Sequence, residues 1–208
     1  LDELHRELKP YMIRRTKDQV LTELPPIHTS QLFVDLPPKY RRQYEALMNK
    51  KNAEAFSTRS GEHLNIIEQC KQIAAEGKIE EVVDYICDYI ESGDKIIVGC
   101  WHRNIVDMIA NHKRLKGKTV SITGDTPNKK RDQAVEAFMH DPQITVFVGN
   151  LQAAGEGLTL TSAHHGIIVE YGWTPAEHKQ FRDRIYRMSQ TKSVNFVYVI
   201  ANNTIEVD

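Results

Sequence analysis

The sequence predicts an α/β fold: a parallel sheet with helices on both faces, preceded by a mostly helical N-terminal appendage. From residue 95 onward, short apolar runs such as KIIVGC, ITVFVGN and GIIVEYG alternate with segments of helical periodicity. Runs that are apolar on both faces are typical of parallel strands covered on both sides. Before that point most segments have helical periodicity. We therefore expect a helical appendage over residues 1–77 and an α/β lobe over residues 78–208.

The individual elements follow from periodicity and from the residues that end them. The two prolines of ELPP stop the first predicted helix, because proline lacks an amide donor and restricts the residue before it. The polar stretch 49–62 predicts a loop. The predicted helices are 1–24, 37–48, 63–76, 78–91, 104–112, 128–139 and 174–190. The predicted strands are 28–36, 95–100, 119–123, 144–150, 166–172 and 195–201.

Composition is ordinary for a globular protein and narrows the functional classes. The net charge is −1, from 27 basic and 28 acidic residues, so any nucleic-acid surface must be a local patch. The three scattered cysteines favour reduced thiols, and the nine histidines form no metal-binding motif, so no metal site is expected. No signal peptide is visible in these residues, and no apolar run approaches membrane-spanning length. We expect an intracellular protein, nuclear or in the cytoplasm of a bacterial or phage system, and part of a longer chain.

The segment that begins at Thr174 has a clear helix start. Thr174 and Glu177 form the capping-box pattern, and Pro175 occupies the first helical position, where its missing amide costs nothing. An apolar stripe then follows at helical spacing, which we expect to face the core. This stripe consists of Phe181, Ile185 and Met188.

A polar stripe runs beside the apolar one and consists of Gln180, Arg184 and Arg187. Two arginines on one helical face could bind a phosphate chain in bidentate fashion. The alternative is an ordinary surface helix, in which Asp183 and Arg187 form an i, i+4 ion pair. Spacing alone favours this alternative, and the other motifs of the chain reverse the preference.

Three loops follow predicted strands and should meet at the carboxyl edge of the sheet, where such folds bind ligands. They are Trp101-His102-Arg103, residues 150–161 and residues 171–173. The first offers a stacking ring and a cation, which suits nucleic-acid contact as well as it suits a half-buried tryptophan beside solvated charges. The second carries two glycines, which allow either a close approach to a ligand or a tight turn. The Gly117-Lys118-Thr119 tripeptide lacks the earlier glycine of a phosphate loop, so we reject that motif.

Taken in order, the motifs resemble the second RecA-like lobe of superfamily-two motors, specifically the SWI/SNF-type DNA-translocating ATPases. The resemblance covers nearly the whole chain and leans towards the annealing-helicase-like branch. The matching blocks are YMIRRTKDQVLTELPP, KIIVGCWHRNIVDMI, ITGDTPNKKRDQAVEAF, NLQAAGEGLTLTSA, EYGWTPAEHKQFRDRIYRMSQ and VYVIANNTIEVD.

The resemblance implies roles for particular residues. Arg187 would be the arginine finger, Arg184 a second γ-phosphate contact, and Gln180 their support. The loop that couples ATP to DNA would consist of Gly155, Glu156, Gly157, Leu158 and Thr159. The residues that contact DNA would be Trp101, His102, Arg103, Arg131, Asn150, Gln152 and Trp173. ATP and Mg²⁺ would be bound mainly by an N-terminal RecA-like lobe of the same chain, and the polymer partner would be double-stranded or branched DNA. The 208 residues alone should be inactive as an ATPase.

The chain departs from the family pattern at Tyr186, Ser189, Phe181 and Glu156, where the family usually has histidine, glycine, alanine and a small residue. Two alternatives remain at this stage. An RNA helicase lobe normally carries HRxGRxxR in its sixth motif, and residues 184–190 lack it. A degenerate lobe that only binds protein or nucleic acid would fit the same fold, and an intact ATP-binding loop upstream would argue against it.

Overall fold

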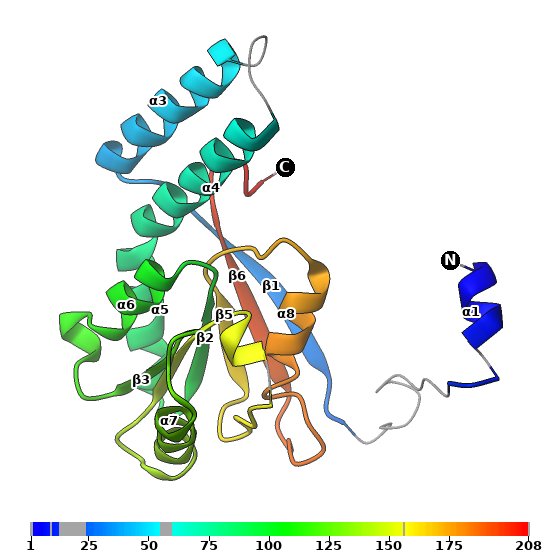
Figure 1. Cartoon of the computed structure of the whole chain (residues 1–208). Coiled ribbons are helices and arrows are strands. Elements are labelled where there is room, and N and C mark those ends of the chain that lie inside the picture. The colour runs from blue at the N-terminus through cyan, green and yellow to red at the C-terminus, as the bar shows by residue number, and fades with distance from the viewer. Residues whose placement is uncertain (1, 9, 13–23, 55–59, 156, 208) are drawn as a thin grey trace.

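A computed structural model describes residues 2–8, 10–12, 24–54, 60–155 and 157–207. Its centre is a six-stranded sheet in the order β1-β6-β5-β2-β4-β3, in which every neighbouring pair is parallel (Figure 1). The predicted α/β fold is therefore confirmed. The strands are β1 (Ile27–Val34), β2 (Ile96–Cys100), β3 (Thr119–Ile122), β4 (Val146–Asn150), β5 (His165–Ile168) and β6 (Val194–Ala201).

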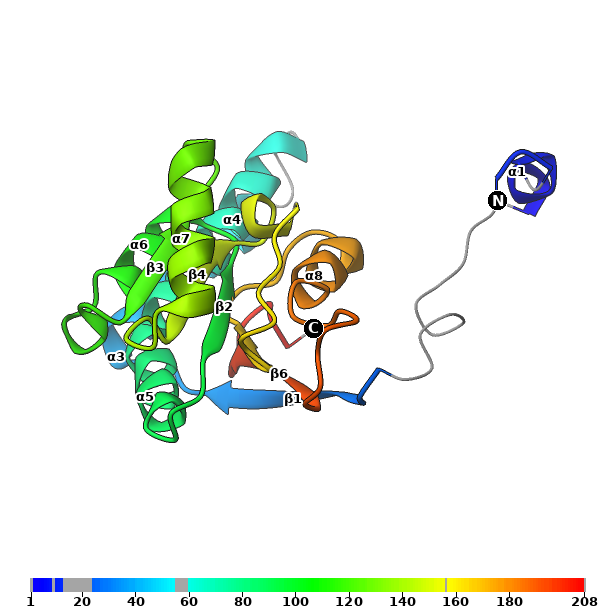
Figure 2. The same ribbon diagram turned by 90° about the horizontal axis from the view of Figure 1, so that it is seen from below.

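Helices cover both faces of this sheet, as the apolar strands require. On one face, α5 (Ile79–Ile90) and α6 (Arg103–Ala110) pack against the strands in a continuous apolar core. On the other face, α7 (Asn128–His140) and α8 (Pro175–Arg182) bury Phe138 and Phe181 in a second core. Figure 2 shows α5 and α8 on opposite sides of the strands. Short 3₁₀ turns η1 (Lys113–Leu115) and η2 (Ala153–Gly155) follow α6 and β4.

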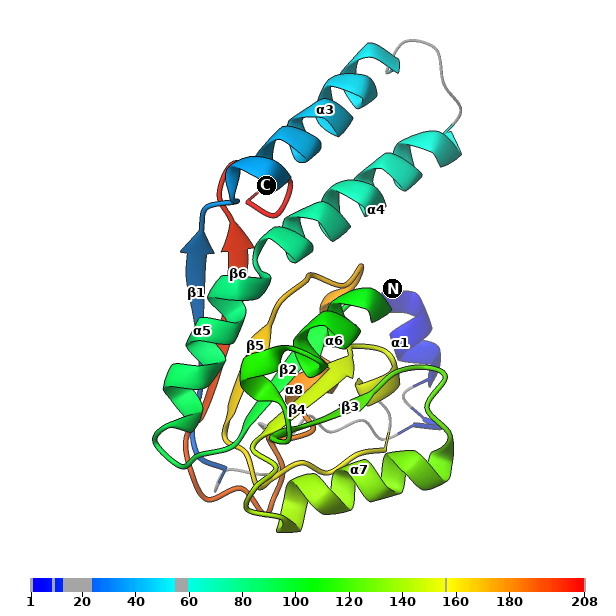
Figure 3. The same cartoon turned by 90° about the vertical axis from the view of Figure 1, so that its left-hand side faces the viewer.

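Two long helices form a hairpin beyond the carboxyl ends of β1 and β6 (Figure 3). They are α3 (Pro38–Glu54) and α4 (Ser60–Gly77), so the loop predicted over 49–62 is wrong in its outer parts. A third core, around Leu36, Tyr44 and Cys70, joins the hairpin to the end of β6. At Gly77 a Cβ would lie 2.7 Å from a methyl carbon of Leu36 and 3.1 Å from Cβ of Tyr40, so a larger residue would have to displace these side chains. The hairpin is therefore fixed at its base.

The first 77 residues also supply a strand to the main sheet. β1 is one of the two edge strands and pairs with β6 along its whole length, from Ile27 opposite Val194 to Val34 opposite Ala201. Of the helix predicted over residues 1–24, the structure has α1 (Asp2–Leu8), while residues 13–23 lie outside its described part. No helix in the described ranges is long and apolar enough to cross a membrane.

The C-terminal tail is anchored by a buried ion pair. Lys78, at the start of α5, is completely buried and its ammonium lies 2.7 Å from the carboxylate of Glu206. The same ammonium donates to the carbonyls of Val169 and Val199, and Glu206 also accepts a bond from the Ala201 amide. The pair therefore ties the end of α4 and the start of α5 to the ends of two central strands.

The helix predicted over residues 174–190 is shorter in the structure. Its start is confirmed: the capping box of Thr174 and Glu177 is present, and Pro175 lies in the first turn. Its end is wrong, because α8 stops at Arg182 and turns follow. Met188 is 79% exposed, so the prediction that it faces the core is also wrong. Phe181 and Ile185 are buried as predicted.

Tertiary hydrogen bonds take the place of helical ones beyond Arg182. In a continued helix each carbonyl would accept from the amide four residues later. The Arg184 carbonyl accepts instead from the Leu160 amide at 2.9 Å, and the Ile185 carbonyl accepts from the Gln190 side chain at 3.3 Å. The chain therefore leaves the helix and folds against the loop that follows β4.

Candidate functional site

The loops after β2 and β4 are joined at the carboxyl edge of the sheet through Asn150. Its side-chain amide donates to the Trp101 carbonyl, and its side-chain oxygen accepts from the backbone amides of Gln152 at 3.1 Å and Ala153 at 3.3 Å. One asparagine thus closes the turn after β4 and fixes the loop after β2. The structure brings the predicted residues Trp101, Asn150 and Gln152 together.

Glu170, just after β5, fixes the Trp101-His102 segment by hydrogen bonds to its carboxylate. Its carboxylate is 1% exposed and accepts from the amides of Trp101 at 2.8 Å and His102 at 2.9 Å. It also lies 2.5 Å from Nδ1 of His102. Burial lowers the pKa of His102, but the bond and charge of Glu170 and the charge of Glu68 raise it by more, so the net pKa is above its ordinary value. The imidazole of His102 thus lies between two carboxylates.

Helix α4 contacts the same loops from the opposite side. The Glu68 carboxylate lies 2.9 Å from Nε2 of His102. The Lys71 ammonium lies 5.2 Å from the ring centre of Trp101 and 4.6 Å from that of Trp173. Glu68, Lys71 and Glu170 were not predicted from the sequence. An acid at the end of an apolar strand was a visible signal for Glu170, whereas nothing in the sequence placed α4 here.

The two predicted DNA-contacting arginines have different surroundings. Arg103 is exposed and pairs with the exposed carboxylate of Asp125. Arg131 donates to three backbone carbonyls: those of Thr126 at 3.2 Å, Thr123 at 3.2 Å and Ala153 at 3.3 Å. Arg131 therefore braces the loop before α7 against the turn after β4, and contact between Arg131 and DNA stays a prediction.

The N-terminal end of α8 presents Trp173, which is 50% exposed. Glu177 accepts from the Thr174 amide at 3.0 Å and from the Gln152 side chain at 3.3 Å. Burial raises the pKa of Glu177, but these hydrogen bonds lower it by more, so the carboxylate is ionised at neutral pH. Gln152 and Trp173 are thus held on adjoining loops, beside Trp101.

Arg184 and Arg187 both bind the loop between β4 and β5. Arg184 donates from Nη1 to the Leu158 carbonyl at 3.3 Å and from Nε to the Gln180 carbonyl at 2.9 Å. Arg187 donates from Nη1 to the Thr159 hydroxyl at 3.0 Å. The contact from Gln180 is made by its backbone, and its side chain is exposed. The structure therefore joins the two arginines to Leu158 and Thr159 of the predicted coupling loop.

Backbone geometry explains why a glycine lies at position 157 of that loop. Gly157 has a φ of 68°, in the left-handed region that side chains disfavour. Gly155 ends η2, and Glu156 lies outside the described residues. The sharp turn at Gly157 brings Leu158 and Thr159 back towards the arginines.

The chemistry of this donor set fits a terminal phosphate group. Burial, then the neighbouring charge of Arg187, lowers the pKa of Arg184, although Asp183 opposes the shift. Within the described part of the chain, Nη2 of Arg184 and Nη2 of Arg187 donate no hydrogen bond. An anion would therefore offset the repulsion and use these free donors. No group of three His, Cys, Asp or Glu residues in the described ranges is placed to hold a metal ion.

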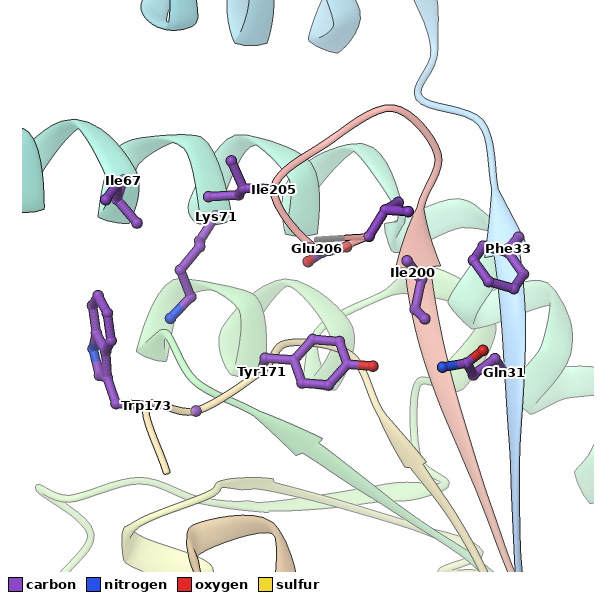
Figure 4. Close-up of a pocket in the computed structure, with 11 residues that line it drawn as sticks. Gln31, Phe33, Ile67, Lys71, Tyr171, Trp173, Ile200, Ile205 and Glu206 are labelled. Atoms are coloured by element: carbon purple, nitrogen blue, oxygen red, sulfur yellow. The ribbon is translucent and has the colours of Figure 1, made fainter. Parts of the chain in front are cut away.

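The pocket drawn in Figure 4 lies away from the arginines. It has a volume of about 570 Å³ and lies between α4, the C-terminal tail and the strands β1 and β6. Lys71, Tyr171 and Trp173 line it on one side, and Phe33 and Ile200 line it on the other. It therefore adjoins the tryptophan loops and takes no part in the arginine site.

Two protein families match consecutive parts of the chain. Residues 1–79 match the SNF2-related domain, and residues 77–189 match the helicase conserved C-terminal domain, which alone covers more than half of the 208 residues. The chain belongs to the SNF2-related helicase family. The resemblance found in the motifs is thereby confirmed, and the two family matches meet at residues 77–79.

Relatives in this helicase family match almost the whole chain. The "DNA annealing helicase and endonuclease ZRANB3" of Mus musculus is 34% identical over 215 residues, covering 99% of this chain and 20% of that protein. The "SWI/SNF-related matrix-associated actin-dependent regulator of chromatin subfamily A-like protein 1" of Xenopus tropicalis is 32% identical and covers 94% of this chain and 21% of that protein. The chain thus spans about a fifth of the length of these relatives.

A solved SNF2-family structure has the same fold. The SWI2/SNF2 ATPase core of Sulfolobus solfataricus, in complex with dsDNA, superposes with a TM-score of 0.77 and is 25% identical. It covers 99% of this chain, which corresponds to 48% of that protein. This chain therefore contains a helicase conserved C-terminal domain with the fold of an SWI2/SNF2 ATPase core, and the roles of its individual residues stay predictions.

Proposed function

We propose that this chain is the second motor lobe of an ATP-dependent translocase that acts on double-stranded DNA. The observation that carries the proposal is the contact of Arg184 and Arg187 with Leu158 and Thr159. This contact joins two candidate phosphate-binding cations to a loop whose other end adjoins the predicted DNA-facing residues. A lobe built in this way transmits changes between a nucleotide site and a DNA track.

Arg187 is the proposed arginine finger and Arg184 the second phosphate contact. Bound ATP with Mg²⁺ would supply a phosphoryl group whose transition state spreads negative charge over its oxygens. Arg187 and Arg184 would direct their free Nη2 donors to that charge, and Thr159 and Leu158 would hold the guanidinium groups in place. An arginine in this role is worth about 10³ to 10⁵ in kcat.

The proposed DNA track is the carboxyl edge of the sheet. Trp101, His102, Arg103 and Asn150 come from two loops that share hydrogen bonds, and Trp173 with Gln152 adjoins them. The double-stranded DNA in the Sulfolobus complex supports this polymer as the partner. Exposed indole and guanidinium groups suit contacts with sugar and phosphate, which position a protein without reading sequence.

The lobe supplies only half of the proposed site. By the resemblance to the family, Mg²⁺ and most of the ATP would be bound by an N-terminal RecA-like lobe of the same protein. Residues 1–77 would serve as the linker and protrusion that lead into residues 78–208. The translocase would work where DNA lies, in a nucleus or in the cytoplasm of a bacterial or phage system.

Two measurements on the purified 208-residue chain test the proposal. Duplex DNA should bind in a salt-dependent manner, because phosphate contacts release counterions. ATP turnover should stay at the buffer background, with or without DNA, and should arise when the remainder of the protein is present. Turnover by the chain alone that is abolished in Arg187→Ala would contradict the half-site account, and absence of any DNA binding would contradict the proposed track.

A further inference from the structure

We propose that Lys71 of α4 is a positioning residue that holds Trp101 and Trp173 of the proposed DNA track in one arrangement. The inference rests on the proposed DNA track and adds a residue that the motifs do not contain. It also gives the hairpin of α3 and α4 a role, because this hairpin carries the lysine to the loops after β2 and β5.

The geometry places one cation between two indoles. Nζ of Lys71 lies 5.2 Å from the ring centre of Trp101 and 4.6 Å from that of Trp173. Figure 4 shows the end of the Lys71 side chain beside the Trp173 ring. Lys71 is only 8% exposed, and cation–π attraction strengthens as water is removed from the ammonium group.

A carboxylate of α4 contacts the same ammonium. Glu68 lies 3.7 Å from the Lys71 ammonium, and its other oxygen lies 2.9 Å from Nε2 of His102. The ammonium therefore lies near one carboxylate and two aromatic rings, and the same carboxylate group also contacts His102. Two side chains on one face of α4 thus reach the Trp101-His102 segment together.

The tryptophans come from different parts of the chain and need a common support. Trp101 follows β2 and is fixed from below by Glu170, whereas Trp173 precedes α8 and is half exposed. Lys71 contacts both rings, so its loss frees Trp173 in particular. Tilting of α4 would move both indoles at once, so movement of the hairpin would change the proposed DNA track.

Intrinsic fluorescence observes this arrangement directly, because Trp101 and Trp173 are the only two tryptophans of the 208-residue chain. The test uses Lys71→Met, which keeps the apolar stem and removes the charge, and Lys71→Arg, which keeps a cation. Lys116→Met, at an exposed position remote from the loops, is the matched control. Urea unfolding of each variant first confirms that it is folded.

We expect the fluorescence emission of Lys71→Met to change and its affinity for a 30-base-pair duplex to fall at least fivefold. Lys71→Arg and Lys116→Met should behave like the wild type in both measurements. A double-mutant cycle with Trp173→Phe should show that the two losses in affinity do not add. Unchanged emission or unchanged affinity in Lys71→Met, or additive losses in the cycle, would overturn the proposal. If Lys71→Met does not fold, Lys71→Gln replaces it with the same expected and contrary results.

The two measurements, tryptophan emission and duplex affinity, separate this inference from the proposed function. If the wild-type chain binds no duplex, the DNA track is wrong, and the emission of Lys71→Met still decides whether the lysine positions the indoles. If the wild-type chain binds duplex and Lys71→Met binds it equally well, the track stands and the role of Lys71 is refuted.

Discussion

Arg187 donates a hydrogen bond of 3.0 Å from Nη1 to the hydroxyl group of Thr159, which lies 28 residues earlier in the chain. The neighbouring Arg184 donates to the Leu158 carbonyl at 3.3 Å. The proposed finger and its partner are therefore fixed by the loop between β4 and β5, so a movement of that loop changes where the guanidinium groups point.

Replacement of the Thr159 hydroxyl tests this fixation. Thr159→Val keeps the shape of the side chain and removes the acceptor for Arg187. We expect kcat for DNA-stimulated ATP hydrolysis by the full-length protein to fall about tenfold, which corresponds to roughly 1.4 kcal/mol of transition-state stabilisation. Affinity for ATP should change little, because the first lobe would hold most of the nucleotide.

Thr161→Val is the matched control for this substitution. Thr161 accepts a 3.3 Å bond from Ser189 on the same pair of segments, away from both guanidinium groups. Its kcat should stay within about twofold of the wild-type value, since no catalytic group loses a partner. Equal losses in both variants would mean that general loosening of the loop, and not the bond to Arg187, lowers the rate.

The buried pair of Lys78 and Glu206 should dominate the stability of the tail. Lys78→Met leaves the Glu206 carboxylate buried without its cation, which typically costs about 3 to 5 kcal/mol. We expect a fall of that order in the free energy of unfolding, measured by urea titration with circular dichroism. Lys78→Met combined with Glu206→Gln should be more stable than Lys78→Met alone. Equal or lower stability of the double variant would refute the account of an uncompensated charge.

His165 should make the protein sensitive to acid. Burial first, then the nearby His164, lowers its pKa from 6.5 to about 4, although Asp94 opposes the shift. The folded pKa is depressed, so the unfolded chain binds a proton first. The resulting stability is present above pH 6.5 and is lost as the pH falls towards 4, by roughly 3 kcal/mol for the full shift.

His165→Gln removes this titration and keeps an acceptor for the Tyr85 hydroxyl, which lies 2.8 Å from Nε2 of the histidine. Between pH 6.5 and pH 4, the free energy of unfolding should therefore fall less steeply in the variant than in the wild type. The measurement is urea unfolding at intervals across this range. Parallel pH profiles would show that other groups, and not His165, cause the acid sensitivity.

The pKa of His102 should respond to its buried carboxylate partner. Burial lowers this pKa, but Glu170 and Glu68 raise it above its ordinary value of 6.5, so the stabilising contribution is full below pH 6.5 and is lost as the pH rises through the folded pKa. Titration of His102 followed by NMR should show a pKa above 6.5, and Glu170→Gln should lower it. An unchanged value in Glu170→Gln would show that Glu170 does not raise the pKa of His102.

Local patterns were sufficient to predict most of the sheet. Apolar runs identified β2 to β6, because a strand covered on both faces needs apolar side chains on both sides, and alternation identified the edge strand β1. The start of α8 was equally readable, since Thr174, Pro175 and Glu177 act within one helical turn. The end of α8 could not be predicted, because the carbonyls of Arg184 and Ile185 accept hydrogen bonds from the Leu160 amide and the Gln190 side chain.

The same limit applies to the candidate site. Residues in loops directly after strands, such as Trp101 and Asn150, could be predicted because parallel strands end at one edge. Lys71 and Glu68 lie on a helix that enters the site only when the hairpin packs against β6 and its neighbours. Periodicity shows which face of α4 is apolar, but it does not show which loops lie opposite that face.

The most direct test of the central claim is ATP hydrolysis by the full-length protein and its Arg187→Ala variant, each with and without duplex DNA. The account predicts DNA-stimulated turnover in the wild type and a loss of about 10³-fold or more in the variant, with duplex binding retained. Absence of turnover in the wild type, or a variant as active as the wild type, would contradict a motor lobe that supplies the arginine finger.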